Sequence, residues 1–194
     1  MKLVLLFSPI LLFLSSCISE EKEHFKTYFD FDSLVSSQLD LMRQSRPVLI
    51  KKTILNSKVD SLQLNFDTTR LKNELEIFRL PDVINKPMYK GLYTIETNED
   101  FNSNLMTKIF STTGKSPVPF VKLFLKENIN ELKRIETQVN ETNIMIDSHR
   151  TLTIEFDDCR GRPRLVHYRI TSRQKMIFSH AVNLSIEGWL KYPV

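Results

Sequence analysis

The stretch "TLTIEFDDCRGRPRLVHYRIT", Thr151 to Thr171, contains two alternating runs that flank a charged turn. The apolar residues that share one face of these runs are Leu152, Ile154 and Phe156 in the first and Val166, Tyr168 and Ile170 in the second. Alternation of apolar and polar residues is typical of antiparallel strands that have one covered face and one face in water. This stretch therefore predicts a hairpin within an antiparallel sheet.

The same pattern extends through much of the second half of the chain. Further candidate strands are "MYKGLYTIET", "NLMTKIFST", "VPFVKLFLK" and "ELKRIETQV", at residues 88–97, 104–112, 118–126 and 131–139. No strand–helix unit repeats along the chain, which argues against a parallel sheet. We therefore expect a sheet built mainly of antiparallel neighbours.

The last apolar stretch, Lys175 to Leu190, allows two interpretations. A single strand of this length would span about 50 Å, which is longer than most strands. It either bends strongly along a curved sheet, or a turn near His180 to Asn183 divides it. In the first case His180 lies on the apolar face, as a buried neutral histidine with a backbone partner or as a ligand-binding residue. In the second case it is a loop residue.

Two helices are predicted in the first half of the chain. From Glu20 to about Arg43 the pattern is helical, and its stripe consists of Phe25, Tyr28, Val35, Leu39 and Met42, with Asp32 filling one gap. We expect this helix to pack on the core; the alternative is a helix that lies in a membrane surface. A second helix begins after a cap at Asp67 or Thr68 and runs to about Leu80, where Pro81 ends it.

A hairpin is predicted between the two helices. The strands "PVLIKKTIL" and "VDSLQLNF" flank the polar turn Asn56-Ser57-Lys58. Together with the strands above, these elements predict the α+β class, with an N-terminal helix and a second helix packed on a curved antiparallel sheet. No low-complexity linker divides the chain, so residues 25–194 are expected to form a single domain.

Composition excludes several functional classes. The chain has 194 residues, of which 41% are hydrophobic and 26% charged, values that suit one ordinary globular domain. Its net charge of +4 gives no support to nucleic-acid binding, which needs a basic face. Only four glycines occur, widely spaced, whereas phosphate-binding loops need clustered glycines. We expect no nucleic acid, nucleotide or other cofactor as a partner.

The N-terminus has the features of a secretory signal. Leu3 to Leu14 is almost wholly apolar, and as a helix it would rise only about 18 Å, too short for a ~30 Å hydrocarbon core. The following Leu14-Ser15-Ser16-Cys17 resembles the bacterial lipobox. That resemblance implies that residues 1–16 are removed, that Cys17 receives acyl chains such as palmitate, and that these chains hold the protein at a membrane. A plain secretory signal or an N-terminal anchor helix is the alternative.

The residues after Cys17 form a charged tether. Residues 17–24 include the run Ser19-Glu20-Glu21-Lys22-Glu23, which resembles the surface-export signals of Bacteroidota lipoproteins. A solvated tether is the equally simple interpretation. We expect the protein to lie in the cell envelope, at the outer membrane. Exposure on the cell surface is an open alternative. If Cys17 is lipidated, Cys159 has no partner for a disulfide.

The segment "LKNELEIFRLPDVINKPMYKGLYTIE", Leu71 to Glu96, resembles a family of uncharacterised Bacteroidota lipoproteins. The shared features are a helix followed by the turn Ile84-Asn85-Lys86-Pro87, then Tyr89 and Tyr93, and a final strand pair similar to "YRITSRQKMIF" and "LSIEGWL". That family usually has tryptophan where this chain has Tyr89. The resemblance implies an envelope lipoprotein with an α+β fold and a turn in the last stretch; it implies no activity.

Candidate site residues are few. Tyr89 and Tyr93 either pack where helix meets sheet or face a ligand. In "FDDCRGRPR" the arginines Arg160, Arg162 and Arg164 form either a solvated charged turn or a contact for lipid phosphate groups. His24, His149, His167 and His180 have no metal-ligand spacing, and no Gly-x-Ser-x-Gly elbow occurs. We therefore expect neither a metal site nor catalytic residues, and an enzyme is the least favoured class.

These observations favour a non-catalytic envelope lipoprotein that binds or scaffolds an envelope protein partner at the outer membrane. The alternative is a carrier or sensor whose curved sheet holds an apolar ligand such as an acyl chain. The phenylalanine-rich strand region around Phe110, Phe120 and Phe124 motivates that alternative, although core packing also explains it.

Overall fold

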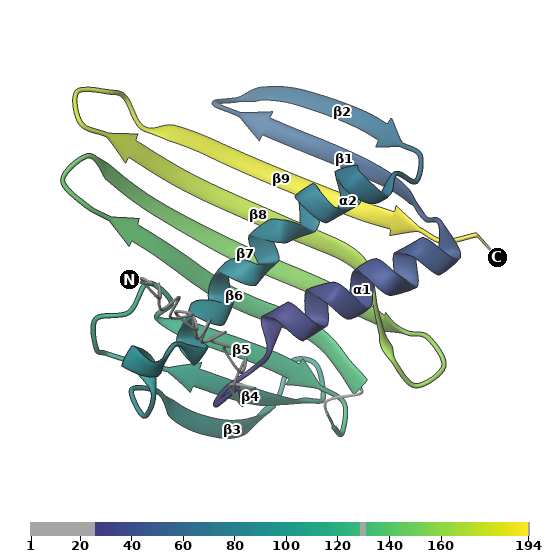
Figure 1. Cartoon of the computed structure of the whole chain (residues 1–194), viewed down its shortest axis with the longest axis horizontal. Coiled ribbons are helices and arrows are strands. Elements are labelled where there is room, and N and C mark those ends of the chain that lie inside the picture. Colours follow the sequence, from purple (N-terminus) through teal and green to yellow (C-terminus); the bar gives the residue numbers. More distant parts are fainter. Residues whose placement is uncertain (1–25, 129–130, 194) are drawn as a thin grey trace, which may run out of the picture.

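The computed structural model describes residues 26–128 and 131–193 and shows a large antiparallel sheet with helices across one face (Figure 1). The predicted signal peptide, Cys17 and most of the charged tether lie outside the described residues. Within these residues, no helix is both long enough and apolar enough to span a bilayer.

Within residues 26–128 and 131–193, nine strands form one sheet in the order β2-β1-β9-β8-β7-β6-β5-β4-β3, and every neighbouring pair is antiparallel. The strands are β1 (Val48–Leu55), β2 (Lys58–Leu64), β3 (Thr94–Asp100), β4 (Leu105–Ser111), β5 (Phe120–Leu125), β6 (Leu132–Thr142), β7 (Ile146–Asp158), β8 (Pro163–Met176) and β9 (Val182–Lys191). Strands β2 and β3 are the two edges, so the sheet is open. This architecture confirms a mixed fold, and the sheet dominates it.

The β7–β8 hairpin has a bulge that shifts the predicted alternation. Glu155 pairs with His167, but Phe156 pairs with Leu165, so β8 carries one extra residue at this point. Leu165 is therefore buried in place of Val166, which the alternation had assigned to the apolar face. Tyr168 and Ile170 are buried as predicted.

The last apolar stretch contains a turn, as one of the two interpretations required. Strand β8 ends at Met176 and β9 begins at Val182. His180 lies between them and is exposed, so it is not on a buried apolar face. The predicted first hairpin is also present; Asn56 and Ser57 have φ of 45° and 74°, which suits the tight turn between β1 and β2.

Helix α1 (Phe31–Ser45) begins later than the sequence pattern indicated. The described residues 26–30 are not helical, and the helix starts where Asp30 accepts a hydrogen bond from the backbone N–H of Ser33. Phe31 is fully buried while Asp32 is half-exposed, so Phe31 and not Asp32 occupies the buried stripe. The buried residues of the helix are Phe31, Val35, Gln38, Leu39 and Met42.

Helix α2 (Thr68–Leu75) is also shorter than predicted. Asp67 caps it as expected, but from Glu76 the chain tightens into the 3₁₀ helix η1 (Glu76–Asn85), which continues through Pro81. A second 3₁₀ turn, η2 (Pro87–Tyr89), follows. The expected strand at residues 88–97 therefore begins only at Thr94.

A buried polar contact fixes α2 to the sheet. Tyr168 of β8 donates a hydrogen bond to Glu74 (2.6 Å), and Lys51 of β1 pairs with the other oxygen of the same carboxylate (2.7 Å). Gly188 on β9 leaves room for this ring, because a Cβ built there would lie 2.2 Å from Tyr168 Cζ. Burial and the neighbouring Glu74 charge raise the pKa of Tyr168, so its hydroxyl remains a donor.

Candidate functional site

A groove runs between α1 and one part of the sheet, and we call it the α1 groove. Its volume is about 960 Å³, within the usual range of small-molecule sites. Its lining residues are Tyr28, Phe29, Asp30, Ser33, Leu34, Ser37, Gln38, Asp40, Leu41, Gln44, Lys108, Phe110, Leu123, Leu125, Leu132, Arg162 and Pro163. From Ser33 to Gln44 the groove follows the helix for about 17 Å. The groove is therefore long enough for an extended hydrocarbon chain of about this length.

The floor of the α1 groove is apolar because strand alternation directs one set of side chains toward the helix. It consists of Phe110 of β4, Leu123 and Leu125 of β5, and Leu132 of β6. Phe110, Leu123 and Leu132 are almost completely buried, whereas Leu125 is half-buried. Leu125 therefore supplies most of the apolar surface that the floor exposes, and the other three residues lie beneath it in the core.

The α1 wall comes from a second flank of the helix. Leu34 and Leu41 are half-buried and line the groove, while Val35 and Met42 are buried with the main core. Leu34 and Leu41 lie off the stripe that the sequence pattern places on the core. The helix therefore divides its apolar side chains between the core and the groove.

One cation lies on the groove floor. Lys108 pairs in register with Leu123, and its Nζ lies 5.4 Å from the centroid of the Phe110 ring. Arg162 of the β7–β8 turn also lines the groove, and Asp30 and Asp40 line it from the α1 side. An anionic group on an apolar ligand could pair with Lys108.

Gln38 holds α1 at a fixed position beside the sheet. Its amide donates a hydrogen bond to the Pro163 carbonyl (2.8 Å) and accepts one from the Leu165 N–H (2.8 Å), and the side chain is almost fully buried. These two backbone groups begin β8, next to its bulge. A side chain thus completes the hydrogen bonding of a strand end across the helix–sheet interface.

The chain before α1 is fixed by charges. Lys26 pairs with Asp82 and with Asp32 (3.0 Å), and Arg79 also contacts Asp32 (3.3 Å). Burial alone would raise the pKa of Asp32, but the contacts with Lys26 and Arg79 outweigh it and lower that pKa. The carboxylates of Asp30, Asp32 and Asp82 could approach one metal ion, but the Lys26 ammonium already pairs with Asp32 and Asp82.

The turn at Ile84-Asn85-Lys86-Pro87 supports the same segment. Asn85 accepts a hydrogen bond from the Tyr28 N–H (2.9 Å) and donates one to the Phe29 carbonyl (2.9 Å). Tyr93 is buried, contacts the Tyr28 ring edge-on at 5.1 Å, and donates a hydrogen bond to the Val118 carbonyl (2.6 Å). Burial raises its pKa. The predicted turn thus packs against the chain at one end of the α1 groove.

Tyr89 is half-buried against the core, and its carbonyl accepts a hydrogen bond from the Tyr28 hydroxyl (3.3 Å). Neither Tyr89 nor Tyr93 lines the α1 groove. The structure therefore brings these two tyrosines together with Tyr28 as packing residues at the junction of helix and sheet.

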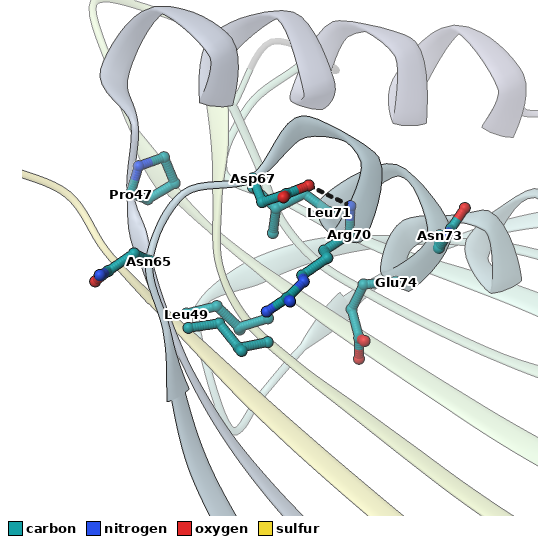
Figure 2. Close-up of a pocket in the computed structure, with 9 residues that line it drawn as sticks. Pro47, Leu49, Asn65, Asp67, Arg70, Leu71, Asn73 and Glu74 are labelled. Atoms are coloured by element: carbon teal, nitrogen blue, oxygen red, sulfur yellow. Dashed lines mark hydrogen bonds between the residues drawn. The ribbon is translucent and has the colours of Figure 1, made fainter.

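A second, smaller pocket lies where α2 meets the first hairpin (Figure 2). Its volume is about 270 Å³, and it is lined by residues of α2 such as Arg70 and Glu74, and by Leu49 and Leu64 of β1 and β2. Figure 2 shows Asp67 accepting the hydrogen bond of the Arg70 N–H that begins α2. This pocket is too small for a long chain, and Glu74 is already paired with Lys51 and Tyr168.

The arginine-rich turn joins β7 to β8. Arg160, with φ of 56°, and Arg162 are exposed, whereas Arg164 is half-buried with its guanidinium 4.4 Å from the centroid of the Tyr192 ring. The turn closes through a hydrogen bond from the Cys159 N–H to the Arg162 carbonyl (2.9 Å). Of the three arginines, Arg162 lines the α1 groove. The Cys159 thiol is free and half-buried.

The phenylalanine-rich strands divide between two faces. Phe110 lines the α1 groove, but Phe124 lies on the opposite face of β5, where Lys122 and Arg134 cover its ring at 4.6 and 3.9 Å from the centroid. Phe120, an even number of positions from Phe124, belongs to that same face. Composition pointed to this region, but only alternation and register separate the groove residue from the other two.

No protein-family model, curated protein or solved structure matches this chain. The assignment of function therefore rests on the residues and their geometry.

Proposed function

We propose that this protein is a non-catalytic, lipid-anchored binding protein of the bacterial cell envelope, and that it holds an acyl chain in the α1 groove. The single observation that supports the ligand is the groove itself, about 960 Å³, with apolar side chains on its floor and with Leu34 and Leu41 among the polar residues of its helix wall. The anchor is Cys17 in the lipobox-like sequence, and the outer membrane is the proposed location.

The ligand class follows from the chemistry of the lining. A long apolar chain can replace water against Leu34, Leu125 and their neighbours, and burial of apolar surface drives binding. Lys108 is placed to pair with a terminal anionic group such as a carboxylate. A fatty acid, or a lipid with an anionic end near its chain, is the ligand that fits both features.

A photoactivatable palmitate analogue tests this proposal with the full chain. We expect crosslinks to map to α1 and to β4–β6. Leu125→Trp fills the groove from its floor and Leu34→Trp fills it from the α1 wall, so each should abolish the crosslink. Ile95→Trp adds the same side chain at an exposed position outside the groove and should leave it unchanged. Crosslinks that survive both groove variants would contradict the proposal.

The head group is tested by competition. Palmitate should displace the analogue better than the corresponding alcohol, because only the acid can pair with Lys108. Lys108→Met keeps a similar apolar stem and removes the charge, so it should remove the preference for the acid. An unchanged preference would mean that Lys108 does not recognise the head group.

A further inference from the structure

Two neighbouring hairpin turns carry large apolar side chains into solvent, and we call them the apolar tips. They are the β6–β7 turn, with Ile144 and Met145, and the β8–β9 turn, with Met176, Ile177 and Phe178. Ile144 is 90% exposed and Phe178 is 100% exposed. Contiguous exposed apolar residues of this size mark an interaction surface.

The two tips form one surface. The N–H of Ile177 donates a hydrogen bond to the carbonyl of Met145 (3.0 Å), which joins the turns directly. Both turns lie at the left-hand end of the sheet in Figure 1. Phe178 has φ of 60°, a region that bulky side chains rarely adopt, so the turn holds this ring outward against its backbone preference.

The distribution of charge around the apolar tips suits a shallow insertion of the tips into a lipid bilayer. The tips carry no Lys, Arg, Asp or Glu from Asn143 to Ile146 or from Met176 to Val182. The first charges are Asp147 and Lys175, which face each other one strand position behind the tips. An apolar end with charges just behind it matches the boundary between hydrocarbon and head groups of a bilayer.

The start of the described chain lies near the same end. Lys26 lines the same pocket as Val139, Asn140 and Glu141 at the end of β6, a few residues before Ile144. Lys26 lies nine positions after Cys17, and nine chain steps can span at most about 32 Å. An anchor at Cys17 therefore keeps this end of the sheet within reach of the membrane.

We infer that the apolar tips insert into the lipid bilayer and orient the sheet on the membrane. This inference rests on the proposed anchoring through Cys17. The anchor supplies proximity, and the tips supply a second point of contact that fixes how the molecule faces the lipid. The α1 groove is then held at a constant orientation to the bilayer.

Tryptophan reporters test this inference in the full, anchored chain. Trp189 is the only tryptophan, so Trp189→Phe gives a silent background. In this background Phe178→Trp is the reporter, and Phe101→Trp is the matched control, because Phe101 is 91% exposed in the β3–β4 turn, at the opposite end of the strands. Both chains are reconstituted in phosphatidylethanolamine and phosphatidylglycerol vesicles with brominated acyl chains.

We expect the brominated lipids to quench most of the Phe178→Trp emission and little of the Phe101→Trp emission. Equal quenching would overturn the inference. A blue-shifted Phe178→Trp emission without quenching would also overturn it, because the tips would then contact protein and not lipid. The mass of the denatured chain tests the anchor separately: a wild-type chain without covalent lipid on Cys17 would refute anchoring while leaving the quenching result intact.

Discussion

At the scale of single residues, Gln38 is the position where one side chain decides how helix and sheet meet. Its amide is hydrogen-bonded to two backbone groups at the start of β8, and the Gln38 side chain is almost fully buried. Gln38 and Pro163 both line the α1 groove, so this contact lies at the border of the groove. Residues of this kind affect stability and site geometry together.

Gln38→Ala should lower the free energy of unfolding by about 1–3 kcal/mol, because the buried Leu165 N–H and the half-buried Pro163 carbonyl both lose their partner. Gln44→Ala is the matched control, since Gln44 is exposed on the same helix, and it should cost less than about 0.5 kcal/mol. Urea denaturation of both variants measures the difference. Equal losses would mean that the Gln38 hydrogen bonds add nothing to stability.

Single residues also mark where the sequence was informative and where it was not. Tyr168 and Ile170 are buried as alternation predicts, but the bulge buries Leu165 in place of Val166. The alternation of apolar and polar residues continues on both sides of the extra residue, so the sequence pattern does not reveal the bulge. The pairing of Gln38 with β8 joins residues 125 and 127 positions apart. No local pattern could reveal that contact.

At the scale of elements, the segment before α1 depends on an ionic network. Lys26 and Arg79 hold Asp32, and their contacts lower its pKa below the usual 3.8 in spite of its partial burial. A carboxyl whose pKa is lower in the folded state contributes stability above the unfolded-state pKa and loses that contribution as pH falls through the folded value. The attachment of this segment should therefore weaken only in acid.

Asp32→Asn should lower the free energy of unfolding at pH 7 by less than about 1 kcal/mol, because the Asp32 side chain is half exposed. The difference from the wild type should hold down to about pH 5 and disappear as the pH falls below the usual carboxyl range. Asp40→Asn is the control, with the same charge change at an exposed site of the same helix. Denaturation at several pH values decides; a pH-independent difference would contradict the ionic origin.

Element boundaries were predicted unevenly, for physical reasons. The strands β4 to β8 were recognised from alternation, and the Asp67 cap located the start of α2. The 3₁₀ segment after Leu75 was not, because its apolar residues also fit an α-helix until Pro81. The start of α1 was misplaced because residues 20–30 continue an apparent helical stripe, whereas the Asp30 cap begins the helix.

At the scale of the whole molecule, the order of the strands decides where the helices cross the sheet and where the α1 groove remains. The chain places β1 and β2 beyond β9, so the helices that follow β2 must cross the sheet to reach β3 at the other edge (Figure 1). The elements α1, α2 and η1 fill much of that face, and the α1 groove remains beside β4–β6. The sequence predicted two helices packed on a curved antiparallel sheet, but not which part of the face would stay uncovered.

The proposed acyl ligand is tested most directly by the mass of the full chain extracted from its own membrane in mild detergent. We predict that the native mass exceeds the denatured mass by one fatty-acid or lipid ligand, since the covalent lipid on Cys17 contributes to both masses. Leu125→Trp should lose this excess. Equal native and denatured masses for the wild-type chain, with the anchor intact, would contradict the account.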